Sequence, residues 1–281
     1  MSSRFSHSKR NIIFGLACLA LVVITLSVAA CKPAGQSYQS KPEAANLNEK
    51  GMAAYEAGDY QTAGSYFESA LEQDPTNPAI WFNKGQTLDA VNMSDKAIEA
   101  YDKAISLDPK FADAWGNKAL SCYDQGQYDK AMESVDKAIE LDGNVASYWS
   151  TRGLIYLAEK KYSDALPCYV RATSLDGSNA DYWAMRANLE VLNKEYDRAI
   201  TSADKALSIS QNNSKAWGYR AKALHELRRY DEALVAFDKG LSLDPQNPAL
   251  WYSKGLTLES LHRDAEAKKC YDKARALGYQ F

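Results

Sequence analysis

Basic side chains recur along this 281-residue sequence at a fixed interval of 34 residues. The positions are Lys50, Lys84, Lys118, Arg152, Arg186, Arg220 and Lys254. A row of cations could bind an anionic polymer, but it could also pair with acids that recur at the same interval. These acids include Asp102, Asp136, Asp204, Asp238 and Asp272. We favour pairing, because lysine and arginine can bury their carbon stems while their charged ends meet neighbouring carboxylates.

A second group of side chains is suited to binding a carboxylate. It consists of Asn188, Lys215, Tyr219, Lys222 and His225. These residues supply hydrogen-bond donors and positive charge over two successive 34-residue intervals. An acidic side chain or the C-terminus of a polypeptide could therefore dock on them.

Catalytic chemistry finds no support in the sequence. The histidines are His7, His225 and His262, and no glycine-rich phosphate loop follows a strand. Five cysteines are present, and the three that follow residue 31 are Cys122, Cys168 and Cys270. Their number is odd and their spacing fits no zinc site, so we predict buried or half-buried hydrophobes. The sequence predicts no enzyme, no metal site and no cofactor.

The interval of 34 residues reflects a tandem repeat. Six tryptophans mark it: Trp81, Trp115, Trp149, Trp183, Trp217 and Trp251. With tryptophan at position 4, seven units span 44–77, 78–111, 112–145, 146–179, 180–213, 214–247 and 248–281, and the first carries Leu47 in that position. Positions 4, 8 and 11 share one face of a first helix, and positions 20, 24 and 27 share one face of a second. Each unit is thus predicted to be a helical hairpin.

Small and aromatic residues in these positions resemble the tetratricopeptide repeat. One unit carries Trp251, Gly255, Ala267, Tyr271 and Ala274, and another carries Trp81, Gly85, Leu88, Ala97, Tyr101, Ala104 and Pro109. The resemblance covers residues 44–281. It implies an all-α fold, a right-handed α-solenoid of seven helical hairpins that bury their core between neighbours and bind another protein.

Local signals refine the expected hairpins. Gly58, Gly126 and His262 fall in the turn between the two helices, with His262 expected to be exposed. We predict N-caps of the second helix at Asp95, Asp129, Ser163, Asp197 and Asp231. Pro167 lies about one turn into a second helix and should be tolerated there.

Two parts of the array depart from the common pattern. Gly143, Gly177 and Gln211 replace the proline that closes other units, and Ala203 replaces a large residue, so looser packing is expected there. In the last unit, Lys268 and Arg275 replace apolar residues. We therefore expect the final helix to face water and to cap the array.

The resemblance also implies a partner-binding groove on the concave face, lined by positions 2, 5, 9, 12 and 13 of the units. We predict its lining as Phe82, Gly116, Leu120, Tyr123, Ser150, Leu154, Leu157, Ala184, Asn188, Val191, Lys215, Gly218, Tyr219, Lys222 and Tyr252. Small residues at position 5 in the middle units predict room above an apolar floor. Alternatively, neighbouring helices cover some of these side chains, Leu157 and Leu192 in particular. The carboxylate clamp of chaperone-binding relatives matches only in part, because position 5 is never basic here.

The N-terminal residues predict export. Arg4, Lys9 and Arg10 precede an apolar stretch at 12–30, so residues 1–30 are expected to be a signal peptide. The stretch ends at Cys31 and resembles a prokaryotic lipoprotein site, which implies lipid attachment there, followed by a flexible tether over residues 31–43. Alternatively, the stretch stays as an uncleaved transmembrane anchor. Both alternatives place the repeats outside the cytoplasm, on the membrane.

Charge argues against nucleic acid as a partner. Without residues 1–30, the protein has 30 basic and 36 acidic residues, a net charge of about −6. Asn92 and Asn212 match the glycosylation sequon. The function predicted is a lipid-anchored, extracytoplasmic scaffold that binds a protein or peptide in its groove and helps to assemble or localise a cell-envelope complex. The alternative is an accessory subunit that tethers an envelope enzyme or an anionic cell-wall polymer.

Overall fold

The repeat folds into consecutive pairs of antiparallel helices. The computed structural model describes residue 38 and residues 40–280, and this part of the protein contains fourteen α-helices and no strand. The helices are α1 (Pro42–Glu56), α2 (Tyr60–Gln73), α3 (Pro78–Ala90), α4 (Ser94–Leu107), α5 (Ala112–Asp124), α6 (Tyr128–Leu141), α7 (Ala146–Ala158), α8 (Tyr162–Leu175), α9 (Ala180–Leu192), α10 (Tyr196–Ile209), α11 (Ser214–Glu226), α12 (Tyr230–Leu243), α13 (Pro248–Ser260) and α14 (Asp264–Ala276). None of these helices is long and apolar enough to cross a bilayer.

Close packing within a hairpin depends on a glycine facing an aromatic ring. A Cβ atom at Gly85 would lie 2.5 Å from the ring of Tyr101, and one at Gly255 would lie 2.5 Å from Tyr271. The ring of Tyr101 is 1% exposed. Burial of such a side chain stabilises the fold by roughly 1.5–3 kcal/mol, so the spacing of positions 8 and 24 holds the two helices together.

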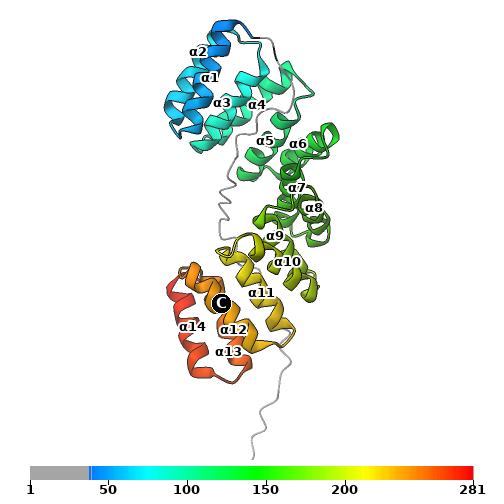
Figure 1. Ribbon diagram of the computed structural model, residues 1–281, viewed down its shortest axis with the longest axis vertical. Coiled ribbons are helices and arrows are strands. Elements are labelled where there is room, and N and C mark those ends of the chain that lie inside the picture. Colours follow the sequence, from blue (N-terminus) through cyan, green and yellow to red (C-terminus); the bar gives the residue numbers. More distant parts are fainter. Residues whose placement is uncertain (1–37, 39, 281) are drawn as a thin grey trace, which may run out of the picture.

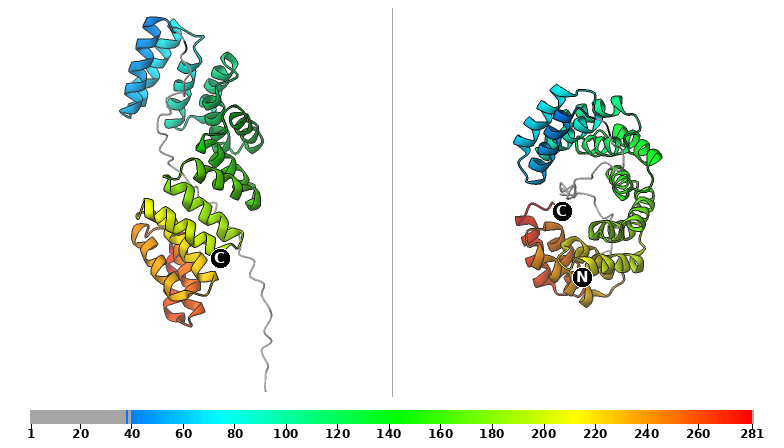
Figure 2. Two further views of the ribbon diagram at one scale, coloured as in Figure 1. Left: turned by 45° about the vertical axis from the view of Figure 1, so that its right-hand side comes forward. Right: turned by 45° about the horizontal axis from the view of Figure 1, so that its top comes forward.

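The hairpins stack into a curved solenoid, as predicted. Consecutive helices pack along the sequence, and most first helices also contact the first helix of the next unit, as α5 does with α7 and α9 with α11. In the middle of the array, α5, α7 and α9 lie on the inner side of the curve, and α6, α8 and α10 lie on its outer side (Figure 1). In the right-hand view of Figure 2, the units run around a common axis, with the first and last units on the same side.

The turn between the two helices of each unit contains one residue with positive φ. Gly58 and Gly126 adopt φ values of 79° and 71°, and His262 is exposed there with φ 58°, so these predictions are confirmed. The predicted N-caps are wrong by two positions. For example, Met93 is the N-cap of α4, and Asp95 lies in the first turn. There its carboxylate faces the positive end of the helix dipole instead of bonding a free N–H.

Other expectations for the array are confirmed. Pro167 lies inside α8 without ending it. Lys268 and Arg275 are exposed on α14 and form ion pairs with Asp272. The three cysteines of the array are free and buried, and burial raises the pKa of the Cys168 thiol to about 11.

The N-terminal boundary of the array lies earlier than predicted. Helix α1 begins at Pro42, because proline suits the first turn of a helix. Tyr38, Ser40 and Lys41 contact the repeats, so the last residues of the expected flexible tether are in fact docked. The predicted signal peptide at 1–30 and the lipid site at Cys31 lie outside the described residues.

Candidate partner-binding face

Small residues at position 5 of the middle units do not leave open space. A Cβ atom at Gly116 would lie 2.4 Å from Tyr148, and one at Gly218 would lie 2.5 Å from Leu250. Tyr148 and Leu250 both occupy position 3 of the following unit. The predicted room above position 5 is therefore wrong, since the next unit fills it with a large side chain.

Six of the predicted groove residues are buried and cannot contact a partner directly. They are Phe82, Gly116, Ser150, Leu154, Ala184 and Gly218. Phe82 packs against Tyr101 and Phe111, with ring centroids 5.9 Å and 4.9 Å away. Leu154 is 4% exposed and belongs to a core cluster with Tyr169 and Leu189. Large side chains of the following unit cover these positions, such as Tyr148 over Gly116 and Leu189 in the cluster of Leu154.

The remaining predicted residues stay accessible on the inner side. Eight are half-buried and one is exposed: Leu120, Tyr123, Leu157, Asn188, Val191, Tyr219, Lys222 and Tyr252, with Lys215 exposed. Leu192 joins them with 39% of its surface exposed. We name Leu120, Tyr123, Leu157, Val191 and Leu192 the apolar strip. It runs over α5, α7 and α9, the three first helices in the middle of the array.

The predicted donor cluster lies on α9 and α11 at one end of the apolar strip. Lys215 is exposed, and the Lys222 ammonium lies 5.9 Å from the centre of the Tyr219 ring. The His225 ring nitrogen Nδ1 is 3.0 Å from the Thr257 hydroxyl. Burial lowers the pKa of His225, so this imidazole adds no positive charge at neutral pH. Lys215 and Lys222 therefore supply the cationic charge of this cluster.

The basic residues at position 7 of units 2 to 7 form ion pairs within the array, whereas Lys50 of unit 1 is exposed. Lys118 pairs with Asp102 at 2.7 Å and lies 5.3 Å above the ring of Trp115. Equivalent ion pairs are Lys84–Glu68, Arg152–Asp136, Arg220–Asp204 and Lys254–Asp238. Each joins two successive units, which supports the structural interpretation of this row over a polymer-binding ladder. The acids at these pairs are about half exposed, so each pair stabilises the fold by at most about 1 kcal/mol.

Unit 5 lacks the ion pair to the preceding unit. Val170 occupies the place of the usual acid on α8, and Arg186 pairs with Glu190 of its own helix at 2.9 Å. The Glu190 side chain is 2% exposed. Sequence reasoning missed this buried ion pair. The sequence feature that could have revealed this pair is the acid at position 11 of unit 5, Glu190, where neighbouring units carry apolar residues such as Leu224.

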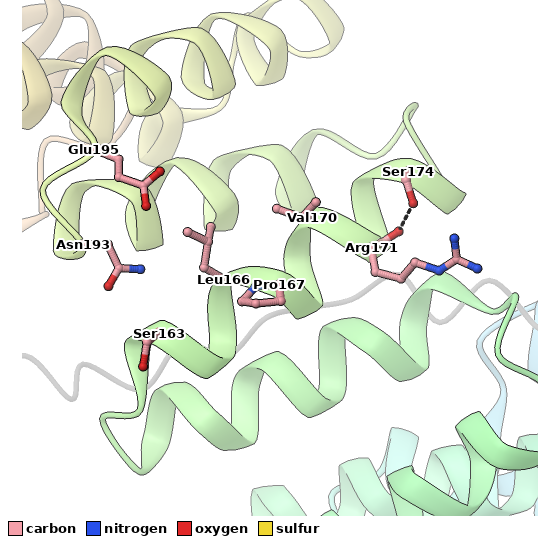
Figure 3. Close-up of a pocket in the computed structure, with 8 residues that line it drawn as sticks. All are labelled: Ser163, Leu166, Pro167, Val170, Arg171, Ser174, Asn193 and Glu195. Carbon is pink, nitrogen blue, oxygen red and sulfur yellow. Dashed lines mark hydrogen bonds between the residues drawn. The ribbon is translucent and has the colours of Figure 1, made fainter.

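A shallow cavity of about 650 Å³ lies on the outer side beside Val170. Figure 3 shows its lining from α8 and from the turn before α10: Ser163, Leu166, Pro167, Val170, Arg171, Ser174, Asn193 and Glu195. Pro167 and Val170 stand where most other units carry polar or charged side chains, so this outer surface is locally apolar. The sequence patterns had not indicated it as a candidate site.

Asp89 of α3 is a titratable group that the sequence patterns also missed. Its carboxylate accepts hydrogen bonds from the hydroxyls of Tyr101 and Ser121, both at 2.8 Å. Burial raises the pKa of Asp89 to about 6, and nearby Asp124 adds to this effect, while the two hydrogen bonds oppose it. Asp89 therefore takes up a proton more readily in the folded protein than in the unfolded chain.

Asp89→Asn is expected to flatten the pH dependence of stability. Because the folded pKa exceeds the unfolded value, the wild type should lose stability as pH rises from about 4 to 6, by at most about 3 kcal/mol. The neutral amide cannot ionise, so the stability of the variant should fall less than that of the wild type over the same pH range. Thermal unfolding at pH 4.5 and pH 7 measures the difference. Equal pH dependence in both proteins would show that Asp89 does not cause it.

In the described part of the protein, no group of three or more His, Cys, Asp or Glu side chains is placed to hold a metal ion. The array instead presents an accessible apolar strip inside its curve.

Sequence profiles of the tetratricopeptide repeat match residues 78–111, 112–145 and 214–247, residues 48–90 and 150–214, and residues 248–274. The chain belongs to the tetratricopeptide repeat family, whose fold is that of a protein-interaction scaffold.

Solved structures show the same fold. YrrB, described as a TPR protein with an unusual peptide-binding site, is 24% identical, with a TM-score of 0.55 over 64% of this chain and 93% of YrrB. PilF of Pseudomonas aeruginosa is 18% identical, with a TM-score of 0.67 over 79% and 97%. A tetratricopeptide repeat protein of Parabacteroides merdae is 18% identical, with a TM-score of 0.63 over 85% and 95%. No protein of curated function matches the sequence significantly.

Proposed function

We propose that this protein is a membrane-tethered scaffold outside the cytoplasm that binds a partner protein along α5, α7 and α9. The observation that carries the proposal is the apolar strip. Its side chains remain accessible, although neighbouring units fill the rest of the same face. Accessible apolar surface within a concave face is typical of a binding site, because a partner segment gains free energy by removing it from water.

The charges beside the apolar strip favour one orientation of the partner. Lys215 and Lys222 lie beyond its α9 end, and Asp124 lies at its α5 end. A partner segment with apolar side chains and an acidic residue or C-terminus at one end would match both features. YrrB, which is described as having a peptide-binding site, gives a precedent for peptide binding on this fold.

The tether of the proposed scaffold is lipid on Cys31. Cys31→Ser should remove the attachment point, because a hydroxyl cannot replace the thiol that carries the lipid. We expect the variant to leave the membrane fraction or to accumulate as an unprocessed precursor, as measured by fractionation and by labelling with a fatty acid. Cys18→Ser, in the apolar stretch, is the matched control and should behave as the wild type. Normal lipid labelling of the Cys31 variant would contradict the proposal.

The envelope role is tested by chemical crosslinking in intact cells, followed by purification of this protein. We expect an exported or envelope protein to be recovered with the wild type. Recovery should fall for a variant that places a charge in the apolar strip. If only cytoplasmic proteins are recovered, or if recovery ignores the strip, the proposed function is wrong.

A further inference from the structure

The residues before α1 form a short docked segment, which we name the strap: Tyr38, Ser40 and Lys41. The Lys41 ammonium donates to the carbonyl of Gln73 at 2.8 Å, and the Ser40 hydroxyl is 3.1 Å from Asp74 Oδ2. Gln73 and Asp74 lie at the end of α2, just before α3 begins. Ser40 and Lys41 are therefore held at the junction of units 1 and 2.

Tyr38 lies one whole unit further along the array. Its hydroxyl donates to Asp108 Oδ2 at 2.5 Å, and its ring centroid is 5.8 Å from that of Phe111. Asp108 closes unit 2, as Asp74 closes unit 1. Each of these carboxylates uses its other oxygen, Oδ1, to accept a backbone N–H of its own turn. Two residues of the strap thus bond the equivalent acids of two successive units.

The place that holds Tyr38 differs from the equivalent places in four other units. At position 34, four units carry an asparagine whose amide oxygen caps the next first helix: Asn77, Asn179, Asn213 and Asn247. Unit 2 carries Phe111 instead, and α5 has no side-chain cap. Loss of such a cap costs roughly 0.5–2 kcal/mol.

The aromatic ring that replaces the cap builds a socket. Phe111 is 3% exposed and packs against Phe82, and Tyr38 packs against the same cluster. The socket has one carboxylate acceptor, Asp108, and an apolar wall, Phe111, directly before the first residue of α5. An apolar wall with a hydrogen-bond acceptor at its edge fits a phenol, which has an apolar body and a polar tip. The protein's own tyrosine demonstrates the fit.

We infer that the socket of Phe111 and Asp108 is a tyrosine-binding site, filled by Tyr38 in the free protein and taken over by a tyrosine of the partner segment when it binds. The inference rests on the proposed function, because the socket lies at the start of α5, the helix whose later turns carry Leu120 and Tyr123 of the apolar strip. The strap is then a built-in competitor. Because Tyr38 is covalently joined to α1, it competes for the socket within its own molecule, so a partner tyrosine succeeds only when its segment also binds elsewhere on the face.

The test uses full-length protein in detergent and a fluorescent peptide with the sequence of residues 35–41, Gly-Gln-Ser-Tyr-Gln-Ser-Lys. Binding is measured by fluorescence polarisation to the wild type and to Tyr38→Ala, which lies outside every helix. We expect the variant to bind the peptide at least tenfold more tightly than the wild type, because its socket is empty. A peptide with alanine in place of tyrosine should bind neither protein.

A second variant separates the socket from general peptide binding. Phe111→Asn in the Tyr38→Ala background removes the aromatic wall and introduces the asparagine found in four other units. Because the buried ring also packs on Phe82, circular dichroism checks that this variant keeps the helical content of Tyr38→Ala. This double variant should no longer bind the peptide. Equal binding to wild type and Tyr38→Ala, no binding to Tyr38→Ala, or retained binding after Phe111→Asn would each overturn the inference. A negative result in this test would refute the tyrosine socket but not the proposed binding of a partner on the apolar strip. Charge substitutions within the strip test that binding separately.

Discussion

Leu154→Glu is expected to lower the free energy of unfolding by about 3–5 kcal/mol, because it places a carboxylate in the core without a partner. Leu154 is 4% exposed and packs with Tyr169 and Leu189 between units 4 and 5. Denaturation followed by circular dichroism measures the loss. The matched control, Leu154→Met, keeps the volume and the apolar character and should cost less than about 1.5 kcal/mol. A Leu154→Glu protein as stable as the wild type would mean that this part of the inner face is open after all.

Leu120→Glu changes the same position one unit earlier and is expected to have the opposite profile. Leu120 is half-buried on α5, so the new carboxylate can reach water and the fold should lose no more than about 1 kcal/mol. Partner capture should weaken at least tenfold, since the partner's apolar side chains would now have to desolvate a charge. The affinity of the captured partner, measured with purified components, gives the size of the effect.

A control for Leu120→Glu lies on the outer side of the array. Val235 on α12 has 62% of its surface exposed. Val235→Glu adds the same charge away from the apolar strip and should leave both stability and capture unchanged. Unchanged capture by Leu120→Glu, or equal loss in both variants, would contradict the role of the strip.

The seven-unit architecture could be predicted from the sequence because it depends on contacts that repeat every 34 residues. Gly85 and Tyr101 lie 16 residues apart within one unit, and the same spacing recurs in Gly255 and Tyr271. The helical period puts each residue on the facing side of its own helix, and the hairpin turn then brings the two helices together. The pairing of Lys118 with Asp102 was accessible in the same way.

The accessible surface could not be predicted equally well, because it depends on which side chains of the next unit cover a given position. Gly116 indicated open space, yet Tyr148 of the next unit fills it. Leu120 and Leu154 occupy the same position, but one is half-buried and the other buried. Position within a unit sets the face of the helix, and the neighbouring unit decides whether that face stays open.

The strap was also beyond the sequence patterns. Tyr38 and Asp108 are 70 residues apart, and the segment around Tyr38 has the composition of a flexible linker. The one signal was Phe111 in a position where four other units carry asparagine. A departure from the repeat can therefore mark a contact made by a residue outside the repeat.

The most direct test of the account is site-specific photo-crosslinking in intact cells. A photoreactive phenylalanine analogue is placed singly at Leu157 or Val191 in the apolar strip, and at Val235 on the outer side as the control. We predict that one partner protein crosslinks from Leu157 and Val191 and is absent from Val235. A partner that crosslinks from Val235 but from neither position of the strip would show that binding occurs outside the curve.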